Sequence, residues 1–99
     1  MTPEQTLWIE VFRGEPPALD REKVLAIVDG LRDPRERTAV RLRYGFEGEP
    51  LSVGEVGRRL PRADGSLGLS RQSAQVILAR ALRHLRHPSR RRAWQEARK

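Results

Sequence analysis

Helix-start patterns recur along this chain and leave little room for other secondary structure. Thr2, Asp33 and Ser52 are N-cap residue types, and each stands three residues before a glutamine or glutamate, which is the spacing of a capping box. Proline directly follows Thr2 and Asp33, at the first helical position, where it is well tolerated. Asp20 and Ser70 supply two more caps. No stretch keeps the period-two alternation of a half-buried strand, so the chain is predicted to be all-α.

Five helices are expected from these starts and from the apolar spacing after them. They cover about residues 3–13, 21–31, 34–44, 53–60 and 71–87. Gly14 and Gly45 are expected to end the first and third helices. Pro88 interrupts the last one, and the residues after it form either one more helix or a frayed tail.

The length of the chain, 99 residues, suits one small domain. Within it we expect an N-terminal helix and linker at 1–20 and the main body at 21–99. There is no cysteine, which excludes disulfides and cysteine-based zinc sites. No apolar run approaches the length of a membrane span, and MTPEQTLWIEVF lacks the basic lead-in of a signal peptide. We expect a cytoplasmic protein with no membrane partner.

Positive charge gathers in the C-terminal third. The net charge of the chain is +7, but residues 71–99 hold nine basic residues against one acidic residue, and residues 1–70 hold 11 basic and 12 acidic. A near-neutral body with a basic end favours a polyanionic partner. A solvated tail that aids solubility is the alternative.

The helices predicted at 53–60 and 71–87 form a helix-turn-helix pattern. Val53, Val56 and Leu60 would turn inward from the first helix. The second helix has its apolar positions three and four apart, at Ala74, Ile77, Ala81, Leu82 and Leu85. Such a second helix fits the major groove, and flanking arginines hold phosphates. A plain helical bundle is the competing interpretation.

Two longer segments make the case more specific. "RERTAVRLRYGFEGEPLSVGEVG" and "ARALRHLRHPSR" closely resemble region 4 of the bacterial sigma-70 family, and the resemblance extends over about residues 25–92. It implies a small all-helical domain that reads the promoter −35 element in double-stranded DNA. It also implies docking on the flap of the RNA polymerase β subunit.

The resemblance also assigns residues. Arg71 and Gln72 fall where the recognition helix contacts bases and phosphates, and Arg58 and Arg59 fall where the first helix meets phosphate. Gln75 stands at a position where the family usually has a phosphate-binding arginine. Val76 stands at a position where the family has a base-reading glutamine. The full set expected to face DNA is Arg58, Arg59, Ser70, Arg71, Gln72, Ser73, Gln75, Val76, Arg80 and Arg83.

The recognition helix departs from the family pattern. Its usual start is rich in arginine and glutamate, whereas this chain has neutral or apolar side chains there. Val76 and Leu78 are apolar where the family has polar, outward-facing residues. They would contact thymine methyls, or they would pack on a partner protein or on the chain's own N-terminal helix. We therefore do not expect the usual −35 sequence to be read.

An insertion separates the two helices of the pattern. The family joins them by a tight turn, whereas here residues 61–67, PRADGSL, intervene before Gly68. Asp64-Gly65 indicates a turn, and loop-closure cost rises slowly with length, so the helix pair is expected to survive. The loop would add an Arg62 phosphate contact, obstruct the groove, or be a tolerated surface insertion.

No catalytic or metal site is expected. His84 and His87 lie three apart, but no cysteine or carboxylate pair accompanies them, and they are interpreted as surface residues. Ser70 and Ser73 have no base placed to activate them. No phosphate-binding glycine loop is present. We expect no enzyme activity, no cofactor and no small-molecule substrate.

Three hypotheses follow. The first is a stand-alone transcription regulator that binds duplex DNA in concert with RNA polymerase, with the basic stretch Arg83 to Arg92 adding electrostatic affinity. The second is an adaptor or inhibitor that binds polymerase or a sigma factor without specific DNA readout. The third is one part of a split sigma factor. A 99-residue chain has no room for the other regions of a complete initiation factor.

Overall fold

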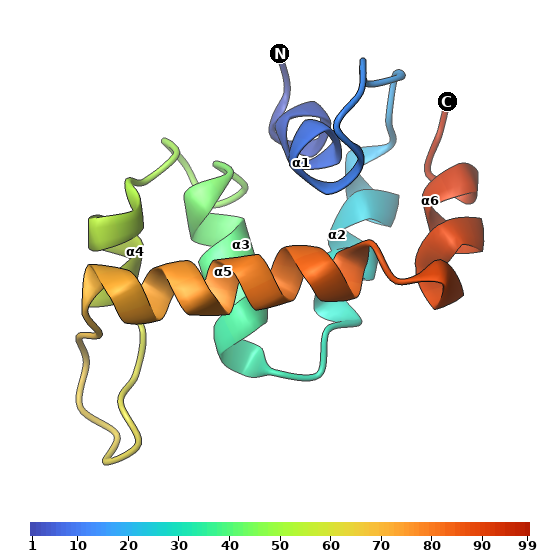
Figure 1. Ribbon diagram of the computed structural model, residues 1–99. Helices are drawn as coiled ribbons and strands as arrows, with labels where there is room; N and C mark the ends of the chain where they lie inside the picture. Colours follow the sequence, from blue (N-terminus) through green and yellow to red (C-terminus); the bar gives the residue numbers. More distant parts are fainter.

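The computed structural model describes residues 1–99, which form helices and no strand. The elements are α1 (Pro3–Phe12), α2 (Arg21–Asp29), α3 (Pro34–Arg43), α4 (Val53–Arg58), α5 (Arg71–Leu85), the short 3-10 helix η1 (Pro88–Arg90) and α6 (Arg91–Glu96). The prediction of a small all-α domain with a helix-turn-helix and an inserted loop is confirmed (Figure 1). None of these helices combines the length and apolar character that a bilayer crossing would need.

The predicted caps start the helices, with one exception in their detail. Thr2 and Ser52 complete reciprocal capping boxes with Gln5 and Glu55. Asp20, Asp33 and Ser70 each accept a hydrogen bond from a backbone N–H in the first turn of their helix. At α3, however, Glu36 does not reach back to its cap. Its carboxylate is buried and contacts α5 instead, as described below.

The end of α1 also differs from the prediction. Arg13, not Gly14, takes the left-handed conformation that closes the helix, with a φ of 59°. Its backbone N–H donates to the Ile9 carbonyl at 2.7 Å. The predicted stop of α3 at Gly45 agrees better, because Gly45 has a φ of 85°, a region that glycine enters without steric cost.

The longest helix, α5, runs across the molecule and gives its two ends different neighbours (Figure 1). α4 packs against its N-terminal end, and η1 and α6 follow its C-terminal end. α3 and α1 also pack against it. The molecule measures 40 × 26 × 21 Å, so the two ends of α5 are distinct surfaces.

A single core of 19 buried residues draws on every α-helix. α1 contributes Leu7 and Val11, both fully buried, so the N-terminal helix covers the core that the main body forms. The predicted boundary at residue 20 stays a prediction, but side chains from both sides of it share this core.

The residues after Pro88 form a packed helix, not a frayed tail. Trp94 in α6 is only 2% exposed and donates its indole N–H to the Leu85 carbonyl at 3.0 Å. Its ring meets Trp8 and Phe12 of α1 edge-on, with centroid distances of 5.8 and 5.3 Å. The backbone N–H of Asp20 donates to the Ala97 carbonyl at 2.8 Å, which joins the start of α2 to the C-terminal end of the chain.

Candidate nucleic-acid interface

A close backbone contact fixes α4 against the start of α5. The N–H of Leu69 donates to the Gly57 carbonyl at 2.7 Å. A Cβ added at Gly57 would lie 2.7 Å from the Leu69 carbonyl oxygen and 3.0 Å from that of Ser70, closer than packed atoms tolerate. Only glycine fits here without a shift, and sequence reasoning did not single this residue out. The buried side chains of Val56 and Ala74 flank the contact.

The inserted loop begins and ends at neighbouring positions, beside the contact between α4 and α5. Gly68 N–H donates to the Leu60 carbonyl at 2.9 Å, and Pro61 and Leu67 form an antiparallel bridge. Residues 61–67 therefore form a small hairpin-like excursion closed at its base, which projects from the end of the molecule where α4 meets α5 (Figure 1). α4 and α5 therefore pack on each other with the seven inserted residues in place.

The tip of the loop is held by its own polar groups. Arg62 N–H donates to the Ser66 carbonyl at 2.7 Å, and the Asp64 carboxylate accepts from the Ser66 N–H and hydroxyl at 3.0 and 2.6 Å. The Arg62 guanidinium donates to the Gly68 carbonyl, so it is folded back onto the loop itself.

Hydrogen bonds hold two carboxylates of the helix-turn-helix ionised. The backbone N–H and the hydroxyl of Ser52 lower the pKa of Glu55, and the hydroxyl and N–H of Ser66 lower the pKa of Asp64. Arg58 and Arg59 lower the pKa of Glu55 further. Both carboxylates are therefore engaged in shaping the start of α4 and the loop tip.

The two faces of α5 separate cleanly. Ser70 caps the helix by accepting from the Ser73 N–H, and the buried face consists of Ala74, Ile77, Leu78, Ala81 and Leu85. Leu78 therefore does not face outward as the family pattern has it at this position, but packs within the protein. Leu78 is 6% exposed, whereas Val76 is 56% exposed, because α3 and α4 both pack on α5 and the buried stripe is wide enough to include two adjacent residues.

The predicted DNA-facing residues lie on the last turn of α4 and along α5, from its N-cap Ser70 to Arg83 in its last turn. Nine of them are exposed and Arg80 is partly exposed; the set is Arg58, Arg59, Ser70, Arg71, Gln72, Ser73, Gln75, Val76, Arg80 and Arg83. The five arginines among them take part in no ion pair or hydrogen bond through their side chains, unlike Arg21, Arg35, Arg41 and Arg92, which pair with carboxylates. Their guanidinium groups are free to meet an external anion.

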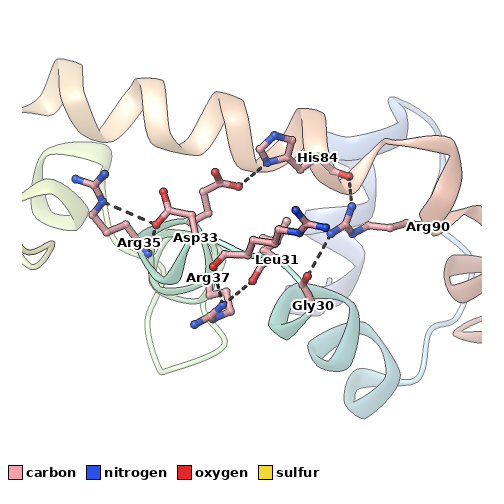
Figure 2. A network of polar contacts seen from close by, with 9 residues as sticks. Gly30, Leu31, Asp33, Arg35, Arg37, His84 and Arg90 are labelled. Atoms are coloured by element: carbon pink, nitrogen blue, oxygen red, sulfur yellow. Dashed lines mark hydrogen bonds and ion pairs between the residues drawn. The ribbon is translucent and has the colours of Figure 1, made fainter.

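Two arginines past the C-terminal end of α5 are already engaged. The Arg86 guanidinium donates to the Val11 carbonyl at 2.6 Å and to the Glu10 carbonyl at 3.3 Å. Arg90 bridges the carbonyls of His84 and Gly30 at 3.1 and 3.2 Å (Figure 2). Part of the basic stretch Arg83 to Arg92 thus joins helices to one another, which its charge alone did not reveal.

The histidines also have protein partners. His84 Nδ1 lies 2.8 Å from Glu36 Oε1, and Glu36 is 2% exposed, so this pair ties α3 to α5 (Figure 2). His87 Nδ1 lies 2.8 Å from the Ser89 hydroxyl. No group of three metal-ligating side chains comes together. Sequence reasoning missed the Glu36–His84 pair, because Glu36 has the spacing of a capping residue.

The packing of α4 on α5 and the exposed arginines along them define a helix-turn-helix domain, and comparison with known proteins agrees. Residues 33–87 match the family Sigma-70, region 4. The chain is 39% identical over 71 residues, 71% of its length, to RNA polymerase sigma factor SigA of Listeria monocytogenes. It is 44% identical over 59 residues, 59% of its length, to the probable RNA polymerase sigma-C factor of Synechocystis. No match among solved structures was found.

With more than half of its length matched, the chain belongs to the sigma-70 region 4 family. The matches cover 17% of the Listeria protein and 13% of the Synechocystis protein. The chain therefore spans less than a fifth of the length of these curated relatives, and what the complete sigma factors do does not transfer to it directly.

Proposed function

We propose that this protein binds duplex DNA through α4 and the start of α5 and regulates transcription together with RNA polymerase. The observation that carries this proposal is the set of five arginines around the exposed face of α5, none of which has a protein partner. Guanidinium groups of this kind hold phosphate oxygens and orient a recognition helix in the major groove. The assigned function is binding and includes no reaction.

RNA polymerase enters the proposal through the family. The matched relatives are named as RNA polymerase sigma factors, and the resemblance of the sequence to region 4 points to the flap of the β subunit as the partner surface. Such a partnership implies a cytoplasmic location.

An adaptor function without sequence readout is the second candidate, and one observation favours it. The outward residues Gln72, Gln75 and Val76 carry no charge, whereas the family pattern has charged residues at the start of this helix. A helix with this face can bind a protein as well as a base edge. In that case the chain would bind polymerase or a sigma factor and modulate it from there.

Selection of duplexes from a random pool at near-physiological salt, with and without RNA polymerase, tests the proposal. An enriched sequence with the protein alone supports direct readout, and enrichment only with polymerase supports a reader that depends on its partner. Capture of polymerase with no enrichment in either arm supports the adaptor. The variant Arg58→Ala/Arg71→Ala is the control, because it should lose DNA in every arm and retain polymerase capture.

A further inference from the structure

The exposed face of the recognition helix has an unusual chemistry. Gln72, Gln75, Val76 and Ala79 lie three, four and seven residues apart, so they share one side of α5, and all four are exposed. None carries a charge, and α5 has no acidic residue in its first turn. The arginines lie around this strip: Arg71 precedes it, and Arg80 and Arg83 follow it.

Each base pair presents a different pattern in the major groove, and this strip suits one class of pair. Glutamine pairs with the N6 and N7 atoms of adenine, and small apolar side chains contact the 5-methyl group of thymine. Guanine is most often read by arginine or lysine, and cytosine by a carboxylate. The strip offers two glutamines and two apolar side chains, and neither a cation nor an acid at its centre.

We infer that α5 reads consecutive A·T base pairs and that Val76 contacts a thymine 5-methyl group. This inference rests on the proposed DNA-binding function and specifies its ligand. Gln72 and Gln75 pair with adenine, and the surrounding arginines contact the phosphates on either side.

The surroundings of Val76 support this assignment. A shallow groove beside it is lined by Leu69, Gln72, Ser73 and Ile77, with Arg35 and Arg80 among its walls. Leu69, Val76 and Ile77 are its apolar lining, and Arg80, which has no protein partner, supplies positive charge beside them. This combination complements a thymine next to its backbone phosphates. Val76 is 56% exposed, so its methyl groups reach a ligand without any rearrangement.

Replacing thymine by uracil tests the inference, because uracil lacks only the 5-methyl group. The site selected above is synthesised with thymine or uracil at each position, and binding of the full chain is measured by fluorescence anisotropy. One buried methyl group contributes about 0.8 kcal/mol, so uracil at the contacted position should weaken binding by the wild-type chain about fourfold. For Val76→Ala the same exchange should change binding by less than about 1.5-fold, because its partner is absent.

The control variant is Leu67→Ala, which removes another exposed apolar side chain, from the loop, and should keep the full uracil effect. Circular dichroism confirms that both variants are folded. A selected site with G·C pairs at its centre overturns the inference, as does a uracil effect that persists in Val76→Ala. In both cases duplex binding, and with it the proposed function, still stands. If the chain binds no duplex even at low salt, the proposed function fails and this inference fails with it.

Discussion

The two ends of α5 carry the same residue type in opposite roles. Near the N-terminal end, Arg58, Arg59 and Arg71 have no side-chain partner in the protein, whereas past the C-terminal end Arg86 and Arg90 donate to carbonyls of α1, α2 and α5 itself. Arginine can do both because its planar fork satisfies carbonyls as well as phosphates. A count of charges therefore overestimates the surface that is free to bind an anion.

Burial follows the same division. The C-terminal end of α5 is closed by an aromatic cluster of Trp8, Phe12 and Trp94. The N-terminal end exposes Val76 and the inserted loop. If this contrast is correct, substitutions at the C-terminal end of α5 lower the stability of the fold, and substitutions at the N-terminal end lower the affinity for DNA. The predictions below set these two effects against each other.

The largest effect on stability is expected at the C-terminal end of α5, where the aromatic cluster packs. Trp94→Ala removes a side chain that is 2% exposed and should lower the free energy of unfolding by about 3–5 kcal/mol, measured by urea denaturation. Val76→Ala at the other end is the matched control and should change stability by less than about 0.5 kcal/mol. Equal losses of stability in Trp94→Ala and Val76→Ala would contradict the proposed difference between the two ends of α5.

The backbone contact between α4 and α5 comes next. Gly57→Ala places a Cβ against the Leu69 carbonyl and should cost about 1–3 kcal/mol of stability, as overpacking does. It should also weaken DNA binding, because α5 is displaced relative to α4. Gly54→Ala is the control, since a Cβ at Gly54 would approach only the end of the Arg58 side chain, at 3.9 Å. A Gly57→Ala variant that binds DNA normally would show that the helix pair tolerates a looser junction.

Two arginine variants compare the ends directly. Arg71→Ala should weaken binding to selected and unrelated duplexes alike, reduce the slope of log affinity against log salt concentration by about 1, and leave the melting temperature unchanged. Arg86→Ala should lower the unfolding free energy by about 1 kcal/mol, because the carbonyls of Glu10 and Val11 lose their donor, and should leave the salt dependence of DNA binding unchanged. Binding titrations at several salt concentrations, with thermal melts, measure both. A loss of stability in Arg71→Ala together with a loss of DNA affinity in Arg86→Ala would refute the difference between the two ends of α5.

The helices could be predicted from sequence because their starts are local. Thr2, Ser52 and Ser70 bond to N–H groups only a few residues away, so their residue type and spacing carry the information. Contacts between residues that are far apart in the sequence leave no such local pattern. Glu36 has the spacing of a capping acid, yet it pairs with His84, 48 positions along the chain.

The candidate site could be predicted only in part, because some of its contacts depend on how distant parts of the chain pack. Periodicity and family resemblance located the exposed arginines, but they left open whether Leu78 contacts a ligand or packs within the protein, where it is buried. Gly57 was visible in the sequence, but its approach to Leu69 depends on how α4 and α5 pack, and no local rule gives that.

A smaller gain in stability is expected at the end of α1. Arg13 adopts a φ of 59°, which costs a residue with a side chain about 1 kcal/mol relative to glycine. Arg13→Gly should therefore raise the melting temperature. Gly14→Ala should have little effect, since a Cβ at Gly14 meets no atom within 4 Å and Gly14 does not have a positive φ. The reverse result would place the helix end at Gly14, as the sequence suggested.

The smallest effect on stability is expected from removing the loop. The Gly68 N–H already donates to the Leu60 carbonyl, so replacing residues 61–67 with Asn-Gly would make this bond the closing bond of a two-residue turn. Because closure cost changes only slowly with loop length, the unfolding free energy should change by less than about 1 kcal/mol. A loss of several kcal/mol would mean that the loop's own hydrogen bonds, and not the contact between Gly57 and Leu69, hold the recognition helix in place. Unchanged stability with altered DNA affinity would instead assign the loop to the binding surface.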